Sequence, residues 1–171
     1  MRPSGGKVRI VGVMGGGAAD EETMEKAREL GERIALEGWV LLTGGRHAGV
    51  MAASARGARE AGGLVVGILP DDHWGRVSPY VTIPILTGMG DARNIINVLS
   101  SHVVVACPGG PGTISEIALA LKAGRPVILM DFDTGGIFDR CEREGRLHRD
   151  KTPRAVIERI KAGETAGAGG S

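Results

Sequence analysis

The residues with the clearest chemical potential lie in the segment 107–124, which has the sequence CPGGPGTISEIALALKAG. The apolar run 102–106 predicts a buried strand, and the helical spacing of apolar residues from Ile114 predicts a helix. The unpaired N–H groups of a first helical turn and the positive end of the helix dipole favour a phosphate or another oxyanion. Glycines let such a ligand approach the main chain without a Cβ in the way. The loop residues expected to bind it are Pro108, Gly109, Gly110 and Gly112.

Two roles are open for Thr113 and Glu116. Their Thr-x-x-Glu spacing matches a capping box, in which the two side chains satisfy each other's backbone amides at the start of a helix. The same two residues could instead line the ligand site, with Glu116 as a polar or catalytic group. A cap requires neither the preceding Pro-Gly-Gly-Pro-Gly sequence nor a buried strand before it, so the context favours the ligand site.

Two further glycine loops are expected to open on the same rim. One follows the β-rich run 7–14, and the other lies between the predicted strand 39–42 and the predicted helix 50–61. Arg46 in the second loop could pair with a ligand phosphate through its guanidinium, or it could be a solvated loop arginine. The glycines expected to bind the ligand here are Gly15, Gly16, Gly44, Gly45 and Gly49.

A third candidate group is carried by a predicted helix over 91–101. Asp91 is expected to cap this helix, which places Arg93 and Asn94 in its first turn. The helix dipole disfavours a cation there, so Arg93 indicates an anionic partner, although a solvent-facing arginine is the alternative. Asn97, one turn later, could share the face of Arg93.

Composition excludes several classes of function. Lys and Arg number 21 against 20 Asp and Glu, and aromatic residues make up 3%, so no nucleic acid is expected as a partner. No metal is expected, because neither the two cysteines nor the Asp71-Asp72-His73 run has a recognised ligand spacing. The spaced dinucleotide fingerprint is absent, which argues against NAD. With no membrane helix and no signal peptide in the sequence, we expect a cytoplasmic protein.

Alternating strands and helices predict one α/β domain over 7–162, a Rossmann-like, doubly wound and mostly parallel sheet with helices on both faces. Residues 1–6 and 163–171 are expected to be flexible. The segment 131–150 has no clear assignment beyond a short helix and a lid, and a last helix is predicted from a Thr152 cap to Lys161. The remaining predicted strands are 64–69, 81–86 and 126–130.

The sequence resembles the LOG-like family, once labelled lysine decarboxylase. The segment Pro108–Glu116 matches its Pro-Gly-Gly-x-Gly-Thr-x-x-Glu signature in full, and 44–51 is similar to its Gly-Gly-x-x-Gly-x-Met element, which adds Met51 to the implied ligand site. Within the family, the stretches 41–46, 92–101 and 110–123 resemble molybdenum cofactor carrier proteins most. This resemblance implies a homodimer or homotetramer that binds the phosphate-bearing molybdenum cofactor as cargo at the glycine loops.

The other branch of the family comprises phosphoribohydrolases, which cleave the N-glycosidic bond of nucleoside 5′-monophosphates such as cytokinin riboside monophosphate or AMP. Similarity to that branch implies catalytic roles for Glu116 and Arg93. This chain departs from it at Asn94, where the enzymes carry lysine, and at Ser115, where many carry glutamate. These neutral residues favour a carrier and leave hydrolysis as the alternative. Pyridoxal phosphate is not expected, because no lysine lies near a glycine loop to form a Schiff base.

Overall fold

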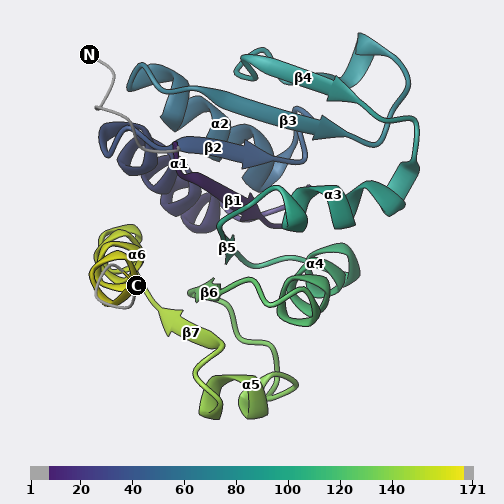
Figure 1. Ribbon diagram of the computed structural model, residues 1–171. Helices are drawn as coiled ribbons and strands as arrows, with labels where there is room; N and C mark the ends of the chain where they lie inside the picture. Colours follow the sequence, from purple (N-terminus) through teal and green to yellow (C-terminus); the bar gives the residue numbers. More distant parts are fainter. Residues whose placement is uncertain (1–7, 168–171) are drawn as a thin grey trace.

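The computed structural model describes residues 8–167 (Figure 1). The predicted flexible segment 1–6 and the last residues of the predicted tail, 168–171, lie outside this range. The strands are β1 (Ile10–Met14), β2 (Val40–Thr43), β3 (Val65–Leu69), β4 (Ile83–Leu86), β5 (Val103–Ala106), β6 (Val127–Met130) and β7 (Leu147–Asp150). The helices are α1 (Glu21–Leu36), α2 (Gly49–Glu60), α3 (Asn94–Leu99), α4 (Pro111–Lys122), α5 (Asp139–Arg143) and α6 (Pro153–Gly167), with short 3-10 helices η1 (Trp74–Arg76) and η2 (Gly90–Arg93).

The strands form one sheet in the order β4-β3-β2-β1-β5-β6-β7, and every neighbouring pair is parallel. The chain builds outward from β1 in one direction and then crosses to β5 to build in the other. This order confirms the predicted Rossmann-like, doubly wound fold. In such a sheet, ligands bind outside the carboxyl ends of the strands where the winding direction reverses, which here is between β1 and β5.

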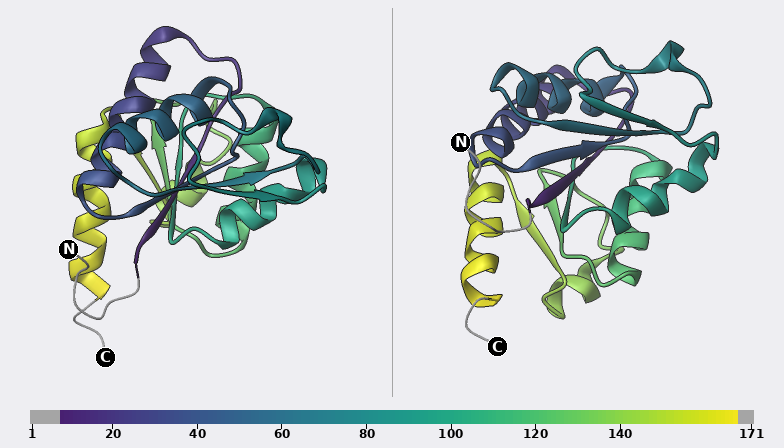
Figure 2. Two further views of the ribbon diagram at one scale, coloured as in Figure 1. Left: turned by 90° about the horizontal axis from the view of Figure 1, so that it is seen from above. Right: turned by 45° about the horizontal axis from the view of Figure 1, so that its top comes forward.

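Helices cover both faces of the sheet (Figure 2). On one face, alternate strand residues such as Val13 and Val105 pack with α1, α2 and α6 in one apolar cluster. On the other face, Val104 and Leu129 pack with α3 and α4 in a second cluster. The continuous apolar character of the central strands follows from this double coverage, because both sides of each strand are buried.

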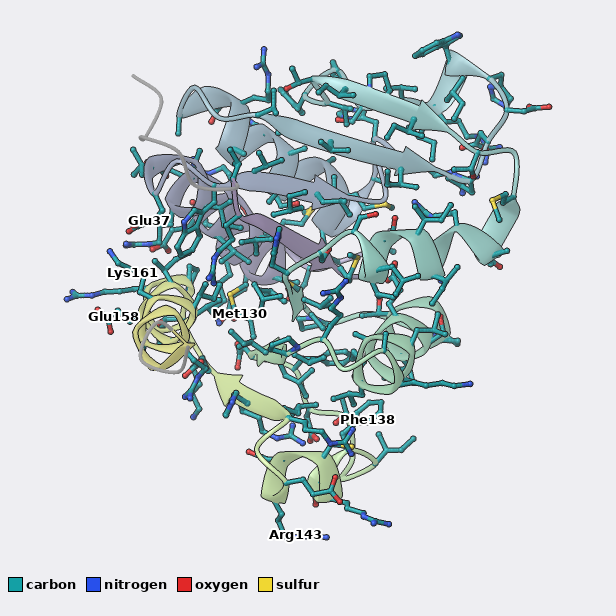
Figure 3. All side chains as sticks on the ribbon, viewed as in Figure 1. Glu37, Met130, Phe138, Arg143, Glu158 and Lys161 are labelled. Carbon is teal, nitrogen blue, oxygen red and sulfur yellow. The ribbon has the colours of Figure 1, made fainter. Side chains whose placement is uncertain are left out.

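Side chains and glycines fix the helix ends as predicted. The Asp20 carboxylate accepts a hydrogen bond from the Thr23 amide (2.8 Å) at the start of α1, and Gly38 follows that helix with a φ of +73°. At the start of α6, the Thr152 hydroxyl accepts from the Ala155 amide (3.2 Å). In Figure 3, Lys161 of α6 lies beside Glu37 at the end of α1, and their side chains are 3.1 Å apart.

Three sequence predictions are wrong in detail. The segment 131–150 contains not only a short helix but also a seventh strand, β7, whose only apolar residue is the buried Leu147. Helix α6 continues to Gly167, so residues 163–167 of the predicted tail are helical. The predicted helix 91–101 is divided into η2 and α3, and Asp91 lies within η2 instead of capping a helix.

Candidate functional site

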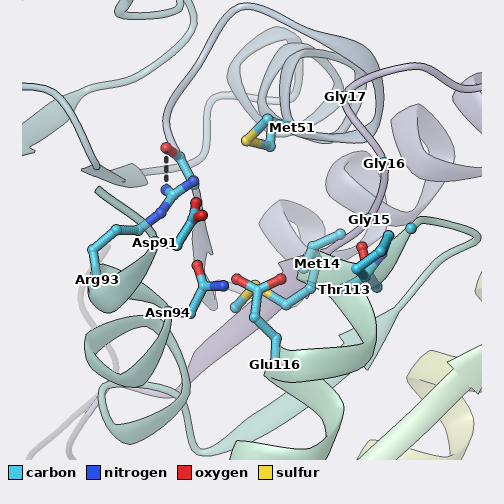
Figure 4. Close-up of a pocket in the computed structure, with 15 residues that line it drawn as sticks. Met14, Gly15, Gly16, Gly17, Met51, Asp91, Arg93, Asn94, Thr113 and Glu116 are labelled. Carbon is cyan, nitrogen blue, oxygen red and sulfur yellow. Dashed lines mark hydrogen bonds between the residues drawn. The ribbon is translucent and has the colours of Figure 1, made fainter. Parts of the chain in front are cut away.

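A cavity of about 190 Å³ lies at the carboxyl ends of the central strands, at the point where the sheet reverses its winding (Figure 4). It is bordered by the turn after β1, the end of β2, the η2–α3 segment and the first turns of α4. The predicted glycine loops therefore meet at one edge of the sheet. The lining residues are Val13, Met14, Gly15, Gly16, Gly17, Gly44, Met51, Asp91, Arg93, Asn94, Gly110, Pro111, Gly112, Thr113 and Glu116.

Main-chain contacts of Gly16 hold these loops together. Its amide donates to the Pro108 carbonyl (3.0 Å), and its own carbonyl accepts from the Val50 amide (3.0 Å) at the start of α2. A Cβ on Gly109 would collide with the Thr113 side chain and approach the Gly16 amide. The close approach of the backbones therefore requires glycine at this position, independently of any ligand.

The first turn of α4 opens onto the cavity. Gly110 is the N-cap residue, so it has no side chain to cap the turn, and no other described residue supplies a side-chain cap. Pro111 has no N–H group, whereas the amides of Gly112 and Thr113 lie in the first turn and have no acceptor within the helix. This uncapped turn, with the positive end of the helix dipole behind it, has the geometry of an anion site.

The capping-box interpretation of Thr113 and Glu116 is wrong. Helix α4 begins at Pro111, earlier than the sequence pattern predicts, because the fixed φ of proline suits the first helical position. Thr113 is consequently inside the helix, and Glu116 lies almost a full turn further on. Both residues line the cavity instead.

Glu116 is a buried acid with one hydrogen bond from the protein. Its side chain lies in a residue that is 8% exposed, and its Oε1 accepts from Asn97 Nδ2 at 2.9 Å. Burial raises the pKa of the Glu116 carboxyl, while the Asn97 hydrogen bond and the positive charge of Arg93 act in the opposite direction. Burial is the largest of these effects.

Arg93 is buried on the opposite wall. Its Nη1 donates to the Gly44 carbonyl (2.6 Å), drawn as the dashed line in Figure 4, and also to the Ile68 carbonyl. Its Nε has no hydrogen-bond partner within residues 8–167. Burial lowers the pKa of the guanidinium. The alternative of a solvent-facing arginine is therefore wrong, and one arm of the guanidinium is committed to the main chain.

Asn94 and Ser115, the two neutral residues singled out in the sequence, contact each other. Asn94 Nδ2 donates to Ser115 Oγ (3.2 Å), and Ser115 Oγ donates to the Gly112 carbonyl (2.7 Å). A polar but uncharged pair thus joins α3 to the first turn of α4 beside the cavity.

Some residues expected at the ligand site do not line the cavity. Arg46 forms a two-point ion pair with Asp71, with N–O distances of 2.9 and 2.7 Å, because the loop after β3 folds back onto the loop after β2. This pair joins residues 25 positions apart, a separation that the local sequence pattern does not reveal. The predicted site residues that do not line the cavity are Gly45, Arg46, Gly49, Pro108 and Gly109.

Several residues that line the cavity are not among those predicted from sequence. Gly17 belongs to the glycine run after β1, and Pro111 lies inside the family signature, so the sequence could have indicated both. The sequence could not have indicated Val13 and Met14, because they look like ordinary core residues of β1. Asp91 has the sequence pattern of a helix cap. The described residues contain no group of three metal-ligating side chains and no helix that could span a membrane.

Comparison with known proteins finds a matching family model, similar solved structures and a similar enzyme. The sequence model of the SLOG cluster4 family matches residues 8–157. The molybdenum cofactor binding protein from Rippkaea orientalis is 48% identical, with a TM-score of 0.87 and coverage of 91% of this chain and 97% of that one. The molybdenum cofactor carrier protein of Chlamydomonas reinhardtii is 43% identical, with a TM-score of 0.84 and coverage of 91% and 98%. The cytokinin riboside 5′-monophosphate phosphoribohydrolase of Mycobacterium tuberculosis is 32% identical over 155 residues, covering 81% of this chain and 79% of the relative.

Proposed function

Because the chain belongs to the SLOG cluster4 family, we propose that it binds a phosphate-bearing small molecule in the cavity, with the phosphate at the first turn of α4. The observation that carries this proposal is the uncapped turn at Gly112 and Thr113, whose amides border the cavity beside the Gly15–Gly17 turn. Main-chain amides and a helix dipole supply the positive potential that a phosphate requires.

The preferred cargo is the molybdenum cofactor, and the preferred role is that of a carrier. The molybdenum cofactor proteins of R. orientalis and C. reinhardtii share more of their sequence with this chain than the mycobacterial hydrolase does. The neutral contact between Asn94 and Ser115 supports the same choice, because it adds no charge for catalysis. Arg93 donates to two carbonyls of the protein, which limits its freedom to act on a substrate.

Substitution of Gly112 by valine tests the anion site. A Cβ on Gly112 meets no atom within 4 Å, so valine would fill space beside the first turn of α4 without a collision inside the protein. We expect Gly112→Val to lower phosphate-ligand affinity by at least about tenfold, as measured by calorimetry with the compound that mass spectrometry finds in the natively purified protein.

The matched control is Gly163→Val in α6, because a Cβ there is equally unobstructed and the residue is remote from the cavity in the chain. The control should bind like the wild type. Equal affinity of Gly112→Val and wild type would remove the first turn of α4 from the proposed site.

A second candidate function is hydrolysis of a nucleoside 5′-monophosphate. It is favoured by the shared sequence with the mycobacterial phosphoribohydrolase and by the placement of both Glu116 and Arg93 on the cavity wall. In this reaction water adds to the sugar carbon, the N-glycosidic bond breaks, and the base leaves with a proton. Glu116 would stabilise positive charge on the sugar or activate the water, and Arg93 would orient the phosphoribosyl group.

Release of free adenine from AMP, followed by chromatography, distinguishes the two functions. A hydrolase would release adenine well above the buffer rate, and Glu116→Gln would lose turnover while it retains binding. A carrier would release none above buffer, and Glu116→Gln would alter only affinity or stability.

We further propose that the chain assembles as a homodimer or homotetramer. The support is an apolar area on β4, where Ile83 and Ile85 are each 45% exposed. Both residues lie on the sheet face that α3 and α4 cover elsewhere, since they pair in register with Val66 and Ile68 of that face. A second copy of the chain would shield these side chains from water.

A further inference from the structure

We infer that Asn97 is the positioning residue for Glu116, and that the ligand therefore carries a hydrogen-bond donor as well as its phosphate. The inference rests on the proposed function, because it concerns the same cavity. It adds a residue that does not line the cavity and narrows the chemical class of the ligand.

Asn97 does not line the cavity but contacts Glu116, which does. It is 0% exposed on α3, and its Nδ2 donates to Glu116 Oε1 across the contact between α3 and α4. The Ser101 hydroxyl donates to the main-chain carbonyl of Asn97 (2.8 Å), which anchors that turn of the chain. The other amide atom, Oδ1, has no hydrogen-bond partner in the described chain. The side-chain amide is thus held for its one contact with Glu116.

This contact decides which carboxylate oxygen of Glu116 meets the ligand. Oε1 is engaged by Asn97, whereas no residue of the range 8–167 donates a hydrogen bond to Oε2. Glu116 lines the cavity, and Figure 4 shows its carboxyl group directed into the space between α3 and the turn after β1. Oε2 is therefore the acceptor offered to a bound molecule.

The cavity has a donor end and an acceptor end. The amides of Gly112 and Thr113 form the donor end, while Glu116 and Asp91 contribute carboxylates and Arg93 offsets part of their charge. An oxyanion without a hydrogen-bond donor would accept hydrogen bonds at the donor end but would be repelled by the carboxylates at the acceptor end. A phosphate ester with a hydroxyl or N–H group near the phosphate satisfies both ends. Sugar hydroxyls and the N–H edge of a heterocycle share this chemistry.

The role of Asn97 can be tested on the protein alone. Asn97→Leu keeps the branched shape and the number of side-chain heavy atoms but cannot donate, so the Glu116 carboxylate loses the hydrogen bond that favours its charged form. Carbon-13 NMR of the side-chain carboxyls should show that Glu116 titrates at a higher pH in Asn97→Leu than in the wild type. Ser54→Ala, on α2 at the other face of the sheet, also removes a buried polar group, but one that does not contact Glu116, so it should leave that titration unchanged. Equal titration in Asn97→Leu and wild type would overturn the positioning role.

Binding of two probes tests the ligand class. We expect Asn97→Leu to weaken AMP binding about tenfold at neutral pH, since a hydrogen bond to a charged group is stronger than one between neutral groups. Inorganic sulfate has no proton to donate at neutral pH and can use only the donor end. It should therefore bind the variant no more weakly than the wild type. Asn97→Ser, too short to reach Glu116, should behave like Asn97→Leu and covers the case in which leucine disturbs folding.

The outcomes separate the two proposals. Wild-type protein that binds sulfate but does not bind AMP would overturn the donor-bearing ligand class while leaving the anion site in place. Wild-type protein that binds neither probe nor any copurified phosphate compound would contradict the proposed function itself. The NMR titration tests the positioning role of Asn97 whichever probe binds, because it needs no ligand.

Discussion

Glu116 lowers the stability of the fold when it is ionised, yet it supplies a polar group to the cavity. Its carboxyl group is buried across the cavity from Arg93, but Arg93 Nη1 donates to main-chain carbonyls instead of to the carboxylate. The single hydrogen bond from Asn97 compensates only part of the lost hydration, so burial raises the pKa of Glu116. Natural proteins keep such groups where a ligand or a reaction needs them.

Stability should therefore fall as pH rises through the titration of Glu116. A carboxyl whose pKa is higher in the folded state binds its proton more tightly there, so the free energy of unfolding decreases from the unfolded pKa up to the folded one. Glu116→Gln does not titrate, and its melting temperature should exceed that of the wild type at pH 8 by more than at pH 4. Each kcal/mol corresponds to roughly 2–4 °C for a chain of this size. Calorimetry over this pH range measures the difference, with exposed Glu158→Gln as control. A difference that does not vary with pH would contradict the effect.

The residues of the site are only partly predictable from sequence. The glycine loops are predictable because glycine at a strand end usually marks a tight turn or a close approach to the main chain, and Arg93 because a cation is unusual at the start of a helix. The roles of Thr113 and Glu116 stay open in the sequence, because they depend on where α4 begins, and a shift of three residues separates a cap from a cavity wall. The pairing of Arg46 with Asp71 depends on loop packing that no local pattern encodes.

At the scale of elements, α1 and α2 approach each other through glycines. A Cβ on Gly31 would collide with the Ser54 carbonyl, and a Cβ on Gly57 would collide with the Arg28 carbonyl. Both contacts are with main chain, which cannot move aside as a flexible side chain could. This packing fixes the position of α2, whose first turn is bonded to Gly16 at the cavity.

We expect Gly31→Ala and Gly57→Ala each to lower the free energy of unfolding by about 1–3 kcal/mol, because the helices must separate to admit the methyl group. Gly163→Ala in α6 is the matched control, since its Cβ would meet open space and alanine favours a helix by roughly 0.5–1 kcal/mol. Urea unfolding of the three variants measures the effects. A stabilised Gly31→Ala would show that the close helix contact is not a constraint.

The elements themselves are largely predictable, because apolar runs bounded by glycines mark the central strands of a parallel sheet. The prediction fails where those signals are weak. Strand β7 has the sequence Leu-His-Arg-Asp at the edge of the sheet, so three of its four residues are polar and no alternation is visible. Its Arg149 is held by Glu142 of α5 at 2.9 Å, a contact that exists only once the segment has folded.

The whole molecule has the fold of its family, and its helices leave part of the sheet exposed at the edge strand β4. Membership of the SLOG cluster4 family and the relatives of known structure confirm the LOG-like resemblance of the sequence and its likeness to molybdenum cofactor carriers. The helices bury the centre of the sheet on both faces, but the edge strand β4 exposes Ile83 and Ile85. Apolar side chains at adjacent positions of one strand face are typical of an interface.

If a second copy covers this area, charge at β4 should dissociate the assembly. We expect the double variant Ile83→Lys, Ile85→Lys to elute as a monomer of 17.7 kDa in size-exclusion chromatography with light scattering, whereas the wild type has twice or four times that mass. The desolvation of two lysines in an apolar contact costs more than a weak interface supplies. Leu36→Lys provides the control, since Leu36 is 70% exposed on α1 and should not alter the mass. A monomeric wild type, or a double variant that keeps the wild-type mass, would remove β4 from the interface.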